Sequence, residues 1–151
     1  MAARMSNPAW VLPGAYEALQ ALQAATEGGG VPASTLALSH LRASQINGCN
    51  ACIDGGCSTA RKAGETDERL AALAEWRDAP YFTAAERAAL ALTEAVTRLG
   101  DRQDPVPDEI WDEAVRHYDE RAMAGLLLTI ATANFYNRLN VPTRQEAGNW
   151  G

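Results

Sequence analysis

Apolar residues recur every three or four positions along most of the chain, which is the spacing of amphipathic helices. Tyr16, Leu19 and Leu22 form one such stripe, which stops at a glycine triplet at 28–30, and the next stripe is broken at 47–48 by Asn-Gly. The pattern and its breaks predict helices over about residues 14–27, 34–47, 49–63, 66–79, 83–99, 109–118 and 119–140.

Capping residues support several of these boundaries. Thr66 and Asp119 stand where a side-chain oxygen can accept a hydrogen bond from the first turn, and Thr83 with Glu86 forms a capping box. Pro142 is expected to lie just past the end of the last helix. Alternating β-branched runs are absent from the sequence. We therefore predict one all-α domain over residues 1–151, a compact orthogonal arrangement of about six or seven helices.

Composition narrows the function classes. The chain has 151 residues, 47% of them hydrophobic, with a net charge of −6 and no basic patch, so a nucleic-acid partner is not expected. The longest uncharged stretch, residues 122–137, is short for a membrane span and favours a buried helix. No secretory leader is apparent, and three cysteines are too few for a disulfide-stapled scaffold. We expect a cytoplasmic protein without a membrane association.

The cysteines offer the clearest chemistry. Cys49 and Cys52 form a Cys-x-x-Cys motif directly after the predicted break. Residues three apart on a helix lie roughly 60° apart around its axis, so the two sulfurs would share a face. Their Cα atoms would be roughly 5–6 Å apart, which suits a disulfide. The first turn of a helix also favours a thiolate, the species that attacks peroxides and disulfides.

Cys57 differs from this pair. It lies five residues beyond Cys52, about 140° around the helix, and is expected to be an ordinary thiol. A zinc site would need all three cysteines with His40 or His117 and a helix broken at Gly55-Gly56, and it lacks the second paired ligand motif that structural zinc sites carry. We therefore expect no metal and no cofactor.

The surrounding sequence adds a family resemblance. The stretch LRASQINGCNACID at 41–54 resembles the core motif of the alkyl hydroperoxidase D-like, or carboxymuconolactone decarboxylase-like, family. Residues 60–99 and NFYNRLNVPTR at 134–144 resemble the segments that follow in its short members. The resemblance implies an all-α homo-oligomer. Its peroxidase branch reduces peroxides with the cysteine pair and is recycled by a dithiol partner such as a lipoylated protein, whereas its decarboxylase branch acts on a small lactone acid and lacks the pair.

The chain departs from the peroxidase branch at the residues that relay a proton from the thiol. Gly56 stands where that branch has its histidine, Ala37 where it has a glutamate, and Ala51 where some members have a further histidine. Loss of a general base commonly lowers a rate by about 10²–10⁴-fold. His40, one helical turn after Ala37, is the candidate substitute base.

Other polar residues are expected to be structural. Glu94 and Arg98 have the spacing of an exposed ion pair, and Asn134 and Asn137 are expected to be hydrogen-bonded in packing. Asp54 is expected to be solvated and His117 to be structural. Trp76 and Trp111 are expected to lie in the core or in an interface. The sequence assigns no role to Arg42, Ser44 and Gln45.

The sequence thus leaves three functions open. The first is a thiol-dependent oxidoreductase that reduces a peroxide or a small organic substrate through Cys49 and Cys52, with a degenerate proton relay. Helix position favours Cys49 as the attacking sulfur, and the resemblance favours Cys52. The second is a non-catalytic oligomeric scaffold, and the third is a carboxymuconolactone decarboxylase-like enzyme.

Overall fold

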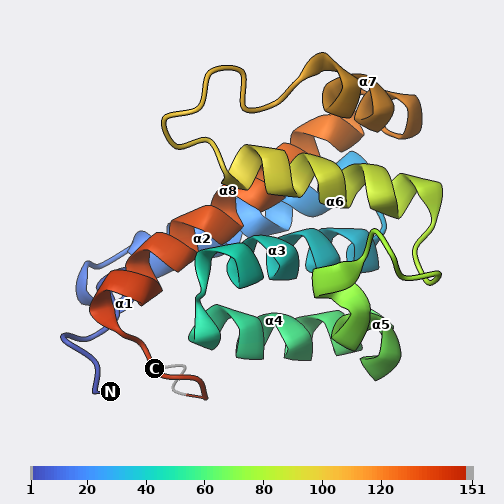
Figure 1. The fold of residues 1–151 in the computed structure, drawn as a ribbon. Helices are drawn as coiled ribbons and strands as arrows, with labels where there is room; N and C mark the ends of the chain where they lie inside the picture. Colours follow the sequence, from blue (N-terminus) through green and yellow to red (C-terminus); the bar gives the residue numbers. More distant parts are fainter. Residues whose placement is uncertain (1, 149–151) are drawn as a thin grey trace.

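The computed structural model describes residues 2–148, which form eight α-helices, two short 3-10 helices and no strand (Figure 1). The all-α prediction is confirmed. The α-helices are α1 (Pro8–Val11), α2 (Ala15–Thr26), α3 (Ala33–Asn47), α4 (Asn50–Lys62), α5 (Asp67–Ala72), α6 (Ala84–Thr97), α7 (Asp108–His117) and α8 (Glu120–Thr143), and the 3-10 helices are η1 (Glu27–Gly29) and η2 (Leu73–Glu75). The single-turn α1 is the helix that the apolar pattern did not predict.

Helix α3 lies at the centre and packs against α8, α4 and α6. Two apolar clusters meet on it. One joins α3, α6, α7 and α8 through residues such as Leu36, Leu92 and Leu126, and the other joins α3 to α4, α5 and α6 through residues such as Leu41 and Trp76. None of the helices within residues 2–148 has the length and apolarity that crossing a bilayer requires.

The predicted caps are confirmed where they can be checked. The side chains of Thr66, Thr83 and Asp119 accept hydrogen bonds from backbone N–H groups three residues on, and Glu86 completes the capping box. The end of α8 was predicted wrongly, because the helix continues through Pro142 to Thr143. A proline in the last turn removes only one backbone donor.

Glu94 is not the exposed partner of Arg98 that its spacing predicted. Its side chain is 5% exposed. The carboxylate accepts hydrogen bonds from Arg42 (2.8 Å), Arg77 (2.5 Å) and Trp76 Nε1 (3.3 Å), whereas Arg98 lies 3.9 Å away. Burial raises the pKa of Glu94, but the hydrogen bonds from Arg77 and Arg42 outweigh it and hold the pKa below its ordinary value. The carboxylate therefore joins α3 and the η2 region to α6.

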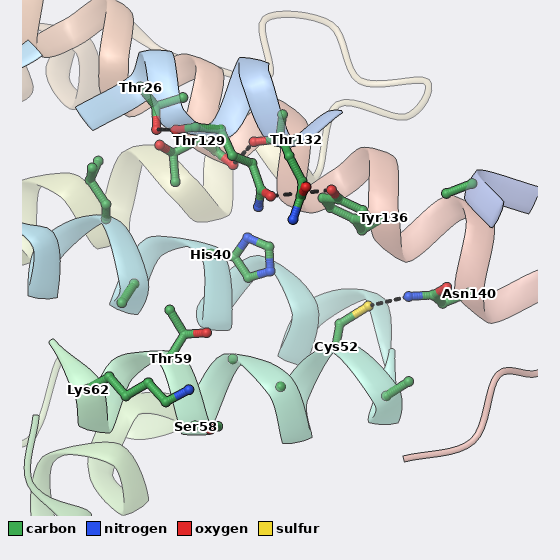
Figure 2. A pocket seen from close by; sticks show the side chains of 18 of the residues that line it. Thr26, His40, Cys52, Ser58, Thr59, Lys62, Thr129, Thr132, Tyr136 and Asn140 are labelled. Carbon is green, nitrogen blue, oxygen red and sulfur yellow. Dashed lines mark hydrogen bonds between the residues drawn. The ribbon is translucent and has the colours of Figure 1, made fainter. Parts of the chain in front are cut away.

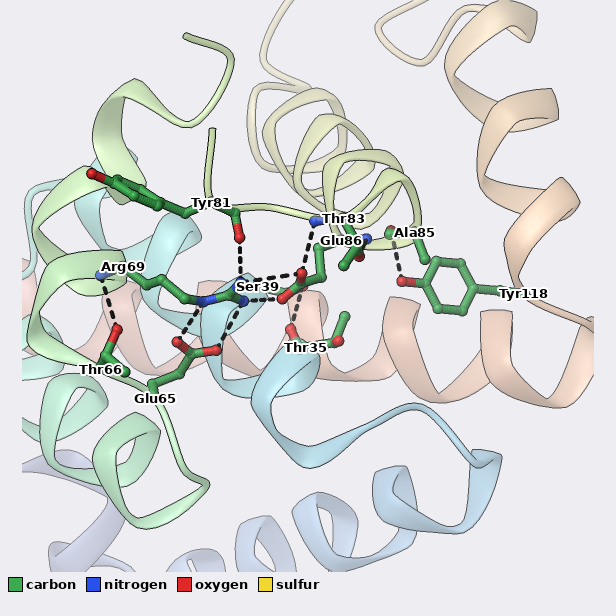
Figure 3. Close-up of polar contacts among 10 residues, drawn as sticks. All are labelled: Thr35, Ser39, Glu65, Thr66, Arg69, Tyr81, Thr83, Ala85, Glu86 and Tyr118. Atoms are coloured by element: carbon green, nitrogen blue, oxygen red, sulfur yellow. Dashed lines mark hydrogen bonds and ion pairs between the residues drawn. The ribbon is translucent and has the colours of Figure 1, made fainter. Parts of the chain in front are cut away.

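A second buried carboxylate joins α5 to α6 (Figure 3). Arg69 lies between Glu65, whose Oε2 is 2.9 Å from Nε, and Glu86, which it contacts through Nη2. Glu86 also accepts a hydrogen bond from the backbone N–H of Thr83 at 2.9 Å. Burial raises the pKa of Glu86, and the hydrogen bonds from Arg69 and Thr83 more than reverse that effect. These two carboxylates fix the helices that support α3 and α4.

Candidate functional site

Cys49 and Cys52 form a disulfide at the start of α4. Gly48 ends α3 in the left-handed conformation, with φ of 66°, and reverses the chain into α4. Cys49 is the N-cap of α4, and its Sγ accepts a hydrogen bond from the backbone N–H of Cys52 at 3.3 Å. The Cα atoms are 5.2 Å apart, as the three-residue spacing predicted.

The two sulfurs have different surroundings. A cavity of about 830 Å³ lies between α2, α3, α4 and α8, and Cys52 lines it whereas Cys49 does not (Figure 2). Cys52 is 5% exposed and Cys49 is 2% exposed, packed with Ala51 and Tyr136. A small molecule in the cavity can therefore reach the sulfur of Cys52 and not that of Cys49.

A helix far away in the sequence supplies a hydrogen-bond donor to Cys52. The Nδ2 of Asn140, near the end of α8, donates to Cys52 Sγ at 3.2 Å (Figure 2). The Oδ1 of Asn140 accepts from Asn7 Nδ2 at 2.9 Å, and Asn7 Oδ1 accepts from the backbone N–H of Ala9 at 3.0 Å. Neither Asn7 nor Asn140 was predicted as a site residue from the sequence. Only the position of Asn140 within the stretch 134–144 pointed to it.

His40 projects from α3 into the same cavity (Figure 2). Burial lowers its pKa to about 4, so its imidazole is neutral near pH 7 and can accept a proton. Gly56 and Ala37 line the cavity as well. A Cβ at Gly56 would lie 3.1 Å from Leu41 Cδ1 and 3.9 Å from His40 Cδ2, so the space that a side chain at 56 would enter is bordered by the imidazole.

Aromatic and polar side chains form the rest of the wall. Trp10 stacks on Tyr16 with ring centroids 4.0 Å apart, and Tyr136 donates to Gln23 Oε1 at 3.3 Å. Burial, and after it the neighbouring Tyr16, raises the pKa of Tyr136 and keeps its hydroxyl protonated. Lys62 lies at the α4 side of the cavity (Figure 2). The cavity thus offers a stacking surface and, at the end of α4 away from Cys52, a cation (Figure 2).

The other predicted residues lie away from the cavity or serve packing. Asn47 Nδ2 donates to the Oδ1 atoms of Asn134 (2.9 Å) and Asn137 (2.8 Å), which confirms their packing role between α3 and α8. His117 pairs with Glu113 on its own helix at 3.1 Å. Among the remaining residues, Cys57 is half-buried and has no disulfide, Asp54 and Trp111 are exposed, and Trp76 is buried in the core. The α3 residues Arg42 and Ser44 bond to other helices, Arg42 to Glu94 of α6 and Ser44 to Asn137 of α8, and Gln45 accepts from Arg42.

The zinc alternative has no ligand set in the part of the chain that the structure describes. Within residues 2–148, no three His, Cys, Asp or Glu side chains come together in a group that could hold a metal ion. Cys49 and Cys52 bind each other instead.

Comparison with known proteins places these features in context. Residues 13–95 match the sequence profile of the carboxymuconolactone decarboxylase family. The uncharacterized protein YdfG of Bacillus subtilis is 33% identical over 137 residues, which cover 91% of this chain and 92% of YdfG.

Two solved structures share the fold. A protein of unknown function from Agrobacterium tumefaciens, suggested to be an AhpD antioxidant-defence protein, superposes with a TM-score of 0.87 and 29% identity, covering 97% of this chain and 98% of that one. The debrominase Bmp8 superposes with a TM-score of 0.77 and 24% identity, covering 91% of this chain and 73% of that one. At this level of identity the similarity supports a shared fold only.

Proposed function

The chain belongs to the carboxymuconolactone decarboxylase family, and we propose that it is a thiol-dependent peroxidase in which Cys52 attacks the peroxide and Cys49 closes the disulfide. One observation carries the proposal: of two bonded sulfurs at a helix N-terminus, only that of Cys52 borders a cavity large enough for an organic hydroperoxide. The suggested antioxidant role of the Agrobacterium protein, which matches nearly the whole chain, supports it.

The first step is displacement at the peroxide oxygen. The Cys52 thiol gives its proton to a base, its sulfur forms an S–O bond, and the O–O bond breaks. The departing alkoxide takes up the proton, so that a thiol and ROOH become a sulfenic acid and ROH. His40 is the base that the cavity offers, because its imidazole is neutral near pH 7 and faces the same space as Cys52.

The second step forms the disulfide that the structure holds. The sulfur of Cys49 attacks the sulfenic sulfur of Cys52, an S–S bond forms, and hydroxide leaves with the Cys49 proton as water. The Cα separation of 5.2 Å lets this happen without rearrangement of the helix. Closure between neighbours three residues apart also protects the sulfenic acid from further oxidation.

An external dithiol would complete the cycle. One of its thiolates attacks Cys52 Sγ from the cavity and Cys49 leaves as a thiolate, after which the second thiol releases Cys52 and the partner becomes a disulfide. The backbone N–H of Cys52, 3.3 Å from Cys49 Sγ, and the N-terminus of α4 stabilise that leaving thiolate. A lipoyl group on a carrier protein has the required chemistry and is slender enough to enter a cavity.

The weak base has a kinetic consequence. Since burial lowers the pKa of His40 to about 4, this imidazole accepts a thiol proton less readily than an unperturbed histidine does. We expect slower turnover than in peroxidases with the full relay, and a rate that rises with pH as more Cys52 becomes thiolate.

Cysteine variants test the proposal with hydrogen peroxide and an alkyl hydroperoxide, using a dihydrolipoyl carrier domain as the reductant. Cys52→Ser is expected to abolish peroxide consumption, and Cys49→Ser to stop turnover after the first oxidation. Cys57→Ser, the matched control, should retain the wild-type rate because Cys57 has no part in the pair. Equal rates in all three variants and the wild type would contradict the proposal.

The two other functions give different results in the same experiments. A binding scaffold would consume no peroxide with any dithiol. A decarboxylase-like enzyme would convert a lactone acid, and its turnover would survive Cys52→Ser, because decarboxylation involves no change in the oxidation state of a sulfur.

A further inference from the structure

The amide of Asn140 bridges the N-terminal segment and the redox pair. Its Nδ2 donates to Cys52 Sγ at 3.2 Å and its Oδ1 accepts from Asn7 at 2.9 Å. The residue is 6% exposed, so water competes little for either group. We propose that Asn140 is a catalytic residue that stabilises the attacking thiolate of Cys52, and that Asn7 is a positioning residue that fixes which end of the Asn140 amide faces the sulfur.

The orientation of both amides follows from one backbone group. The N–H of Ala9 can only donate, and it lies 3.0 Å from the Asn7 amide, so that end of Asn7 must be the oxygen. The other end is then Nδ2, which can only donate to Asn140. The acceptor of Asn140 is therefore Oδ1, and its remaining end, Nδ2, must point at Cys52.

A donor amide at Asn140 favours the thiolate of Cys52 over its disulfide form. A thiolate accepts an N–H hydrogen bond far more strongly than a disulfide sulfur, because charge-assisted hydrogen bonds are about twice as strong as neutral ones. The same donor is therefore expected to assist both attack by Cys52 on a substrate and the departure of Cys52 from the mixed disulfide with the external dithiol. A reversed amide would turn Oδ1 to the thiolate and repel it.

The N-terminal segment is held at two further points, one at the last residue of α8 and one just beyond that helix. The backbone N–H of Arg4 donates to the carbonyl of Thr143 at 2.8 Å, and Gln145 Nε2 donates to the carbonyl of Met5 at 3.0 Å. Asn7 therefore follows directly on a segment whose backbone is fixed at Arg4 and Met5. The single turn α1, whose N-cap is Asn7, thereby gains a function: its first backbone N–H groups orient the Asn7 amide.

The test measures the reactivity of Cys52 in reduced protein that carries Cys49→Ser and Cys57→Ser, so that Cys52 is the only cysteine in the chain. The rate of iodoacetamide alkylation is recorded against pH, and its midpoint reports thiolate formation. The other titratable groups that line the cavity are the same in every variant: Tyr16 and Glu27 from the α2 and η1 side, His40 from α3, Lys62 from α4 and Tyr136 from α8.

Asn140→Leu removes the donor and keeps a similar volume. It is expected to move the alkylation midpoint upward by about one pH unit, the effect of losing one hydrogen bond to a charged group. Asn7→Asp keeps an acceptor for Ala9 but presents a carboxylate to Asn140, which should reverse the amide and raise the midpoint by at least as much. Ser6→Asp, an exposed neighbour that adds the same charge, should move the midpoint by less than about 0.3 unit.

Each result supports or overturns the inference. An unchanged midpoint in Asn140→Leu overturns the role of Asn140, and equal shifts in Asn7→Asp and Ser6→Asp overturn that of Asn7. If Asn7→Asp does not fold, Asn7→Ser replaces it: serine still caps α1 but is too short to reach Asn140, and the midpoint should again rise. The inference deepens the proposed function, but alkylation needs no peroxide, so a failed peroxidase assay and a failed midpoint shift are separate outcomes.

Discussion

Replacement of His40 by glutamine tests the state of the imidazole in the cavity. Burial holds the pKa of His40 at about 4, against 6.5 for the unperturbed side chain. Between these two values the unfolded chain binds a proton that the folded chain does not. The folded state therefore loses stability as the pH falls through this range, and this contribution is absent above it.

The magnitude follows from the two pKa values. Near pH 7.5 the imidazole is neutral in both states, and its protonation contributes almost nothing to the free energy of unfolding. Near pH 5 the unfolded state is almost fully protonated at this site and the folded state is only about one-tenth protonated, which lowers the free energy of unfolding by about 2 kcal/mol. Glutamine carries no titratable group, so the variant escapes this loss.

The assay is urea denaturation of the oxidised proteins at about pH 7.5 and about pH 5, followed by circular dichroism. Carboxylates titrate over the same interval, but they are common to both proteins and cancel in the difference. Wild type is expected to lose about 2 kcal/mol more than His40→Gln between the two conditions. Equal losses would mean that the imidazole titrates freely, and the account of His40 as a half-buried neutral base would be wrong.

Two further predictions concern the fold. Glu94→Gln should lower the free energy of unfolding by about 3 kcal/mol, because it leaves the guanidinium of Arg42 without its buried charged partner. The matched change Glu113→Gln, at a side chain that is 43% exposed, should lower it by less than about 1 kcal/mol. Urea denaturation measures both values, and similar losses in the two variants would refute this prediction. Gly125→Ala should cost about 2 kcal/mol or more, since its Cβ would lie 2.7 Å from the Thr26 carbonyl oxygen, while Gly100→Ala, with open space around it, should be nearly neutral in a thermal melt. A tolerated alanine at 125 would mean that α8 and the end of α2 are not in close contact.

The features that the sequence predicted correctly depend on neighbours in the chain. The caps at Thr66, Thr83 and Asp119 each need only a side-chain oxygen and a backbone N–H three residues away. The pairing of Cys49 with Cys52 likewise follows from helical spacing alone. Local geometry decides such features, and the sequence displays it directly.

The features that sequence analysis missed depend on residues far apart. Glu94 has a possible partner at i+4, but its actual partner Arg42 is 52 residues away on α3. Asn140 reaches Cys52 across 88 residues. The last carbonyls of α8 likewise receive donors from the N-terminal segment, including the Arg4 guanidinium to the Pro142 carbonyl at 3.1 Å. No periodicity within one helix encodes such contacts.

The most direct measurement of the central claim is chemical trapping of the oxidised sulfur. Reduced Cys49→Ser and Cys52→Ser proteins are each treated with one equivalent of peroxide and dimedone, and the modified residue is located by mass spectrometry. A sulfenic acid adduct on Cys52 in Cys49→Ser, with little or none on Cys49 in Cys52→Ser, is the result that the cavity predicts. An adduct on Cys49 alone, or on neither residue, would contradict the assignment of Cys52 as the sulfur that attacks the peroxide.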